Sequence, residues 1–235
     1  MKYIPIFLTL TLALILLAAC TPQNIGDCSA MEGLAKDNCY LEAKQCSQIS
    51  DSAIKDSCIS ELAKTAKNAG LCAAVKDTQA KGYCQEQVAE LNNDGSICNK
   101  IKDTYWSDNC YFHLGINNNE STLCGKIADV PQKGECFYKV AVAINDINLC
   151  YSVTENETDK CIYKIATNTL NTDTCQKVTH PVNKASCTLK IAKLANNSSI
   201  CAKVNVNLIR DDCYKYFEVP ENATETKYDN LTVGA

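Results

Sequence analysis

Apolar side chains recur along this chain with a period of 26 residues, in step with the cysteines. Three residues after the first cysteine of each unit, every side chain is apolar: Met31, Ile49, Val75, Ile101, Ile127, Val153, Val178 and Val204. Four residues after the second cysteine, the side chain is apolar again: Ala43, Leu62, Val88, Leu114, Val140, Ile165, Ile191 and Phe217. Spacings of three and four residues place side chains on one face of a helix. The pattern therefore predicts two helices per unit, each with one buried face.

The cysteine spacing sets the number of units. From Cys46 onward the gaps alternate between 12 and 14 residues, except for one gap of 11 between Cys150 and Cys161. A less regular unit at Cys28 and Cys39 precedes them. A fixed period of this length is typical of stacked repeats. We expect an all-α fold, an α-solenoid of about eight short helical hairpins over residues 28–218, with one disulfide per hairpin.

Polar residues indicate where the helices of each hairpin begin and end. N-caps of the short first helix are expected two residues before a first cysteine, at Ser96, Thr122, Asn148, Asp173 and Ser199. N-caps of the longer second helix are expected five residues after that cysteine, at Asp51, Asp77, Asp103 and Asp129. The first helix should then cover up to about two turns and the second roughly 12–14 residues. Asparagine tolerates left-handed backbone angles, so the runs 92–93 and 117–119 are expected to end a second helix.

The geometry of a hairpin predicts which cysteines pair. If the chain turns five or six residues after the first cysteine, the second lies opposite it, within the distance a disulfide spans. Seventeen cysteines without Cys20 leave sixteen, an even number. Pairing across the 14-residue gaps is the alternative, and it would leave Cys28 and Cys213 without a partner. The predicted pairs are Cys28–Cys39, Cys46–Cys58, Cys72–Cys84, Cys98–Cys110, Cys124–Cys136, Cys150–Cys161, Cys175–Cys187 and Cys201–Cys213.

The N-terminus has the form of an export signal. Met1-Lys2 precedes an apolar run from Ile4 to Ala19, which is short for a membrane span. Its end, Leu17-Ala18-Ala19-Cys20, resembles the lipobox of prokaryotic lipoproteins. The resemblance implies that residues 1–19 are a removed signal peptide and that Cys20 carries the lipid anchoring the chain to a membrane. An ordinary secretory signal cut nearby and an uncleaved anchor are the alternatives. Residues 20–27 would be the lipidated cysteine and a spacer, and 219–235 a flexible tail.

The plan is similar in design to Sel1-like cysteine-rich repeat proteins, which are exported αα-hairpin solenoids with one disulfide per repeat. Their repeats are longer than 26 residues and their sequence signature is absent here, so the resemblance implies no activity. A net charge of −4 gives no basis for binding nucleic acid.

Metal and catalytic chemistry find little support in the sequence. No two cysteines are closer than seven residues, and the two histidines are His113 and His180. Zinc sites built on cysteine need close pairs, and a cysteine nucleophile needs a free thiol, which the predicted pairing leaves unavailable. We therefore expect no metal, no cofactor and no enzymatic activity.

Candidate binding residues lie in the segment 105–113, which is rich in aromatic side chains. Trp106 occupies a position that varies between units, Tyr105 lies beside it, and tryptophan and tyrosine commonly anchor interfaces. Filling the local core is the alternative role for Trp106. N-x-S/T sequons make six asparagines candidate glycan acceptors in an exported chain: Asn119, Asn156, Asn196, Asn197, Asn222 and Asn230.

These features together predict an exported lipoprotein on the outer face of the cytoplasmic membrane or in the cell envelope. We expect an interaction scaffold that binds a protein, a peptide or a glycan. A structural envelope protein without a specific ligand is the alternative, followed by a redox or metal-binding cysteine-rich protein.

Overall fold

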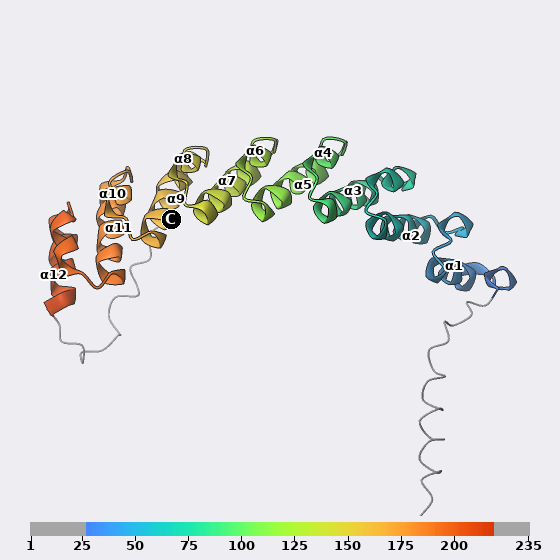
Figure 1. The fold of residues 1–235 in the computed structure, drawn as a ribbon, viewed down its shortest axis with the longest axis horizontal. Helices are drawn as coiled ribbons and strands as arrows, with labels where there is room; N and C mark the ends of the chain where they lie inside the picture. The colour runs from blue at the N-terminus through green and yellow to red at the C-terminus, as the bar shows by residue number, and fades with distance from the viewer. Residues whose placement is uncertain (1–26, 219–235) are drawn as a thin grey trace, which may run out of the picture. The chain divides into compact units, whose positions relative to one another are not determined.

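The computed structural model describes residues 27–218, and every regular element in this range is a helix. The expected signal peptide, Cys20 and the C-terminal tail lie outside the described residues. Short and long helices alternate along the chain (Figure 1), which confirms the all-α hairpin-repeat fold class. The short helices are η2 (Cys28–Ala30), η3 (Cys46–Gln48), η4 (Ala69–Ala74), α4 (Gly95–Cys98), α6 (Ser121–Cys124), α8 (Ile147–Cys150), α10 (Thr172–Cys175) and η5 (Ser198–Lys203). The long helices are α1 (Gly33–Glu42), α2 (Ser52–Thr65), α3 (Thr78–Asn92), α5 (Thr104–Asn117), α7 (Val130–Ile144), α9 (Glu155–Asn168), α11 (Pro181–Leu194) and α12 (Asn207–Glu218).

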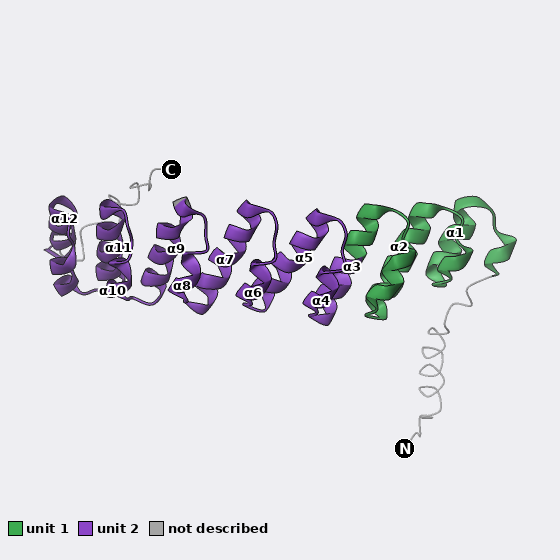
Figure 2. Cartoon of the chain, turned by 90° about the horizontal axis from the view of Figure 1, so that it is seen from above, with its two compact units in different colours: residues 1–84 green, residues 85–235 purple. Residues whose placement is uncertain are grey.

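The chain forms two compact units, which divide within α3 (Figure 2). The first ends at Cys84, and in it α1 packs against α2 and α2 against η4. The second begins at Gln85, and in it α5 packs against α7, α7 against α9, α9 against α11 and α11 against α12. Within each unit, therefore, consecutive hairpins stack in chain order, as expected for a solenoid. No helix among residues 27–218 is long and apolar enough to cross a membrane.

Each hairpin contains one disulfide, between its short and its long helix. The structure has the bonds Cys28–Cys39, Cys46–Cys58, Cys72–Cys84, Cys98–Cys110, Cys124–Cys136, Cys150–Cys161, Cys175–Cys187 and Cys201–Cys213, the pairs that the hairpin geometry predicts. All sixteen of these cysteines are buried. The disulfides thus belong to the core of each hairpin, and their number indicates folding in an oxidising, extracytoplasmic environment.

The apolar positions of the repeat form the rest of the core. The side chains three residues after the first cysteine are buried from Ile49 to Val204, and Met31, in the first described hairpin, is 41% exposed. Four residues after the second cysteine, the buried side chains are Val88, Leu114, Val140, Ile165 and Ile191. The 26-residue pattern therefore reports a real buried face, which the hairpins share with their neighbours.

The predicted N-caps of the long helices are confirmed. The side chain of Asp51 accepts hydrogen bonds from the backbone N–H groups of Ala53 and Ile54, at 2.9 and 3.0 Å. Asp77, Asp103 and Asp129 do the same for the third residue of their helices. Each carboxylate thereby satisfies N–H groups that have no partner inside the helix.

The predicted N-caps of the short helices are wrong by two residues. Asp94, not Ser96, caps α4, and Ser96 donates its backbone N–H to the Asp94 carboxylate. The short helices η4, α6, α8, α10 and η5 begin after the equivalent residue, four before the first cysteine: Asn68, Glu120, Asp146, Asn171 and Asn197. In α4, Asp94 and Ser96 are both capping residue types, so local preference could not choose between them.

A residue with a left-handed backbone follows each long helix from α1 to α11. Asn93 and Asn119 have φ of 53° and 55°, which confirms the expectation for the runs that contain them. The full set is Lys44, Lys67, Asn93, Asn119, Asn145, Leu170 and Asn196. Asparagine adopts this conformation more readily than leucine or lysine, so the repeat has both favourable and unfavourable residues at one position.

The two hairpins with an 11-residue cysteine spacing have a shorter turn. Their long helices begin after Glu32 and Thr154, four residues beyond the first cysteine, whereas Asp51 and Asp103 lie five beyond it. The deletion therefore falls in the turn and leaves the disulfide in place. Gly134 of the preceding hairpin accommodates the second of these turns, because an added Cβ would meet the Thr154 side chain at 3.2 Å.

Candidate functional site

The aromatic pair predicted from the sequence lies in the first turn of α5, directly after the N-cap Asp103. Tyr105 is 64% exposed, and Trp106 is only partly exposed. The two rings meet edge to face, with centroids 5.0 Å apart. The structure therefore gives the pair different environments: Tyr105 projects from the surface and Trp106 is partly covered.

Tyr105 borders a shallow hollow of about 430 Å³ between α5 and α7. Asp108 on α5, which is 4% exposed, and Asp129, the N-cap of α7, also line it. Gln132, another lining residue, donates its amide N–H to Asn109 Oδ1 at 2.7 Å. The hollow thus has one exposed aromatic ring together with carboxylate and amide groups that can accept and donate hydrogen bonds.

An equivalent hollow lies two hairpins further along, between α9 and α11. Asp159 replaces Asp108 and His180 replaces Asp129, at the same positions of the repeat. In both places the carboxylate accepts two backbone N–H groups from the next hairpin: Asp108 from Ala128 and Asp129, and Asp159 from Thr179 and His180. The hollows therefore recur because the same contact recurs: an aspartate carboxylate that accepts two backbone N–H groups from the next hairpin.

The described sequons occupy different kinds of position. Asn119 is exposed and has a left-handed backbone just beyond α5. Asn196 has the same conformation beyond α11, while Asn197 caps η5 and accepts the Ser199 N–H at 3.0 Å. Asn156 lies in the first turn of α9. Asn222 and Asn230 lie outside the described residues.

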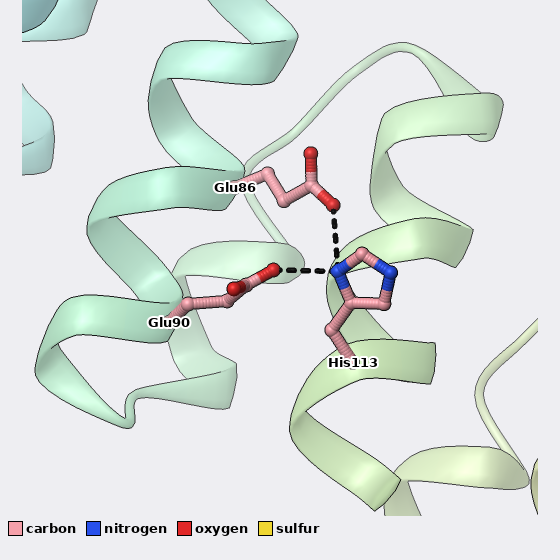
Figure 3. A group of neighbouring side chains, drawn as sticks. All are labelled: Glu86, Glu90 and His113. Atoms are coloured by element: carbon pink, nitrogen blue, oxygen red, sulfur yellow. Dashed lines mark hydrogen bonds and ion pairs between the residues drawn. The ribbon is translucent and has the colours of Figure 1, made fainter. Parts of the chain in front are cut away.

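A second group of chemically active side chains lies between α3 and α5. Glu86 and Glu90 are four residues apart on α3 and so share one helix face, and His113 on α5 points toward that face (Figure 3). His113 Nδ1 lies 2.6 Å from Glu90 Oε1 and 3.3 Å from Glu86 Oε1. One ligand atom from each of the three residues lies within 4.8 Å of the other two.

Burial dominates the electrostatics of this cluster. The Glu86 side chain is 3% exposed, compared with 26% for Glu90 and 46% for His113. Loss of solvent raises the pKa of Glu86 to about 7, with His113 opposing the shift and the nearby Glu90 carboxylate adding to it. Glu86 is therefore a buried acidic group that takes up and releases a proton near neutral pH.

Sequence reasoning considered His113 and missed both glutamates. The repeat contains the signal that could have found them. Subtracting one 26-residue period from His113 gives position 87, between Glu86 and Glu90. Since equivalent positions of stacked hairpins lie side by side, a charged residue on one long helix should be checked against the same position of the next.

The sixteen described cysteines are all in disulfides, so within residues 27–218 no free thiol is present for catalysis or metal binding. Comparison with known proteins adds no further assignment: no family model, no curated protein and no solved structure matches this chain.

Proposed function

We propose that this chain is a non-enzymatic, lipid-anchored interaction scaffold of the cell envelope. It binds a protein, peptide or glycan partner along the first turns of its long helices. The observation that carries the proposal is the exposed Tyr105 ring beside the polar hollow between α5 and α7. A large aromatic side chain held on a helix loses little conformational freedom on binding, which is why tyrosine is favoured at the centres of interfaces.

The neighbouring hairpins support a binding surface at this edge. Large apolar side chains recur in the first turn of the long helices and are 48–74% exposed: Tyr105, Val130, Val182 and Leu208. Single exposed apolar residues are ordinary on protein surfaces. Here they lie six or seven residues after the first cysteine of their hairpins, where they would add apolar contacts to the hydrogen-bonding groups of the hollows.

The disulfide in each hairpin supports a role as a rigid scaffold. Each disulfide closes a loop of about a dozen residues. The loss of unfolded-chain entropy destabilises the unfolded state by roughly 3 kcal/mol at room temperature. A surface that is already ordered before binding loses less conformational entropy when the partner binds. The scaffold therefore presents its side chains in fixed positions outside the cytoplasm.

Membrane attachment rests on the segment Leu17-Ala18-Ala19-Cys20. Mass spectrometry of the mature N-terminus tests it. We expect a chain that begins at a diacylated or triacylated Cys20 and fractionates with membranes. A Cys20→Ala variant should lack the lipid and keep its eight disulfides. A mature N-terminus elsewhere, without lipid, would refute the anchor and leave the binding proposal standing.

Binding is tested by photo-cross-linking from position 105 in cells, with position 151 as the control. Tyr151 is 60% exposed and is the C-cap of the short helix α8, so it lies outside the first turn of any long helix. We expect a discrete adduct from position 105 and none from position 151. Against the purified partner, Tyr105→Ala should weaken binding by at least tenfold, as for an interface anchor, and Tyr151→Ala by less than twofold. Equal binding by wild type and Tyr105→Ala would refute the proposed surface.

A further inference from the structure

We propose that Glu86, Glu90 and His113 bind one divalent transition-metal ion, with Zn²⁺ as the favoured ion among those commonly available. The three side chains converge from α5 and from the part of α3 that belongs to the second unit, and their ligand atoms lie within 4.8 Å of one another. The proposal is independent of the scaffold's binding partner.

Counting protons at His113 shows why the cluster suits a cation. Nδ1 can carry a single proton, yet it faces two carboxylate oxygens, at 2.6 Å and 3.3 Å. Without an ion, two acidic groups share one N–H donor, and one of those groups is buried. A divalent ion would neutralise both carboxylates and accept the lone pair of neutral imidazole. Binding would release the protons that hold the empty cluster together.

Burial of Glu86 distinguishes this cluster from acidic groups on an open surface. A carboxylate is removed from water only at a cost, unless a countercharge compensates for it. Glu86, whose side chain is 3% exposed, points from α3 toward His113, which is itself 46% exposed (Figure 3). The cluster therefore has one fixed, desolvated ligand at its base and two ligands that solvent reaches, so an ion has a path of entry.

The distances need little adjustment to accept an ion. Ligands about 2.0–2.1 Å from a tetrahedral zinc ion lie about 3.4 Å from one another. The separation of Glu86 Oε1 from His113 Nδ1 is 3.3 Å and already fits. Glu90 Oε1 lies 2.6 Å from the same nitrogen and must move away by less than 1 Å. Its partly exposed side chain can make that movement without disturbing the core.

The donor types select the ion. One imidazole nitrogen with two carboxylates suits Zn²⁺, Co²⁺ and their first-row neighbours. Ca²⁺ and Mg²⁺ prefer a shell made of oxygen atoms alone and gain little from imidazole. Three protein ligands leave a fourth position on the ion, which water fills in the isolated protein.

Calorimetric titration of the full-length chain tests the proposal. The protein is purified in detergent with its disulfides intact, without a histidine tag, and is stripped with a chelator before Zn²⁺ is added. We expect one ion per chain with a dissociation constant in the micromolar range. His113→Gln and Glu90→Gln should each weaken binding by at least tenfold. His180→Gln removes the other histidine of the chain and is the matched control, expected to bind like wild type.

Cobalt supplies a spectroscopic readout of the same site. Co²⁺ bound by one nitrogen and two carboxylates should give visible d–d bands that Zn²⁺ abolishes and Ca²⁺ or Mg²⁺ leaves unchanged. The bands should be missing from His113→Gln and present in His180→Gln. Glu90 lies outside the core, so Glu90→Gln is expected to melt within a few degrees of wild type. That variant therefore reports on metal binding without a loss of folding.

Two results would overturn the proposal. The first is a wild-type chain that takes up no stoichiometric Zn²⁺ at neutral pH. The second is a His113→Gln or Glu90→Gln variant that binds Zn²⁺ as tightly as wild type, which would place the bound ion elsewhere on the acidic surface.

Discussion

The backbone N–H of Asp129 donates a 2.9 Å hydrogen bond to the carboxylate of Asp108, across the boundary between two hairpins. The other oxygen of that carboxylate accepts the N–H of Ala128, also at 2.9 Å. Asp108 is 4% exposed and lies two residues before the second cysteine of its hairpin. Aspartates at the same position hold the next hairpin in the same way: Asp37, Asp56 and Asp159. The contact fixes the register between neighbouring repeats, a task that a disulfide inside one hairpin cannot perform.

Replacing Asp108 by alanine should destabilise the second unit by about 1–3 kcal/mol, because two backbone donors lose a charged acceptor. Thermal melting and hydrogen exchange over the start of α7 measure the effect. Asp173→Ala is the control: its side chain is 89% exposed and lies 3.8 Å from Lys203, so its removal should change stability by less than about 0.5 kcal/mol. Similar effects of the two substitutions would mean that Asp108 does not join the hairpins.

Two of these aspartates, Asp37 and Asp159, should also make the protein sensitive to acid. Hydrogen bonds from the N–H groups of Ser50 and Asp51 lower the pKa of Asp37 below its ordinary value of 3.8. For Asp159, burial acts to raise the pKa, but the hydrogen bonds from Thr179 and His180 outweigh it and the net shift is downward. A lowered pKa in the folded state gives stability that is present above pH 3.8 and is lost as the pH falls through the folded-state value.

Melting temperatures of wild type and Asp159→Asn, measured between pH 7 and pH 2.5, test this dependence. The wild type should melt higher at pH 7. The difference should shrink as the pH falls from 3.8 toward the lower folded-state pKa of Asp159, because the carboxyl that becomes protonated loses its advantage over the amide. A difference that stays constant over this range would show that ionisation of Asp159 contributes nothing to stability.

Leu170 offers a way to raise stability. It has φ of 51° at the position where Asn93, Asn119, Asn145 and Asn196 follow their own helices. Leucine is strained in this conformation and asparagine much less so, so Leu170→Asn should stabilise the protein by about 0.5–1 kcal/mol. Leu194→Asn is the control, because Leu194 is similarly exposed but is the last residue of helix α11. If both substitutions raised the free energy of unfolding equally, the gain would come from replacing an exposed apolar side chain and not from relief of the left-handed backbone.

Removal of one disulfide should loosen mainly its own hairpin. In the double variant Cys98→Ala/Cys110→Ala, a bond that closes 12 residues is lost, at a cost of about 3 kcal/mol. Replacing both cysteines leaves no free thiol to form a wrong pair. Hydrogen exchange should rise most over residues 98–117 and least in hairpins further along the second unit, because each repeat contacts only its neighbours. If hydrogen exchange in the double variant were the same as in wild type, the Cys98–Cys110 disulfide would not be needed to hold this hairpin closed.

Local properties of the sequence were enough to predict the hairpins. The cysteine gaps gave the number of units, and the turn between the two helices brought each pair together, because a disulfide within 12 residues depends on short-range geometry. The aspartates that cap the long helices were also predictable, since capping involves N–H groups two or three residues away. For the short helices two capping residues compete, at Asp94 and Ser96, and the sequence alone favoured the wrong one.

The candidate sites depended on how neighbouring hairpins align. The sequence made Tyr105 and Trp106 candidates through the variable position of Trp106, and only the packing of α5 left Tyr105 exposed and partly covered Trp106. Glu86, Glu90 and His113 are separated by up to 27 residues, and they meet because α3 and α5 lie side by side with equivalent positions in register.

By itself, then, the sequence determined a chain built from disulfide-closed helical hairpins, because periodicity, capping and cysteine spacing all act over one repeat. The tertiary structure alone decided which aspartate holds the next hairpin, which aromatic ring faces outward and which acidic groups meet a histidine. Those relationships depend on the offset between adjacent helices, and that offset is set by the packing of whole hairpins against one another.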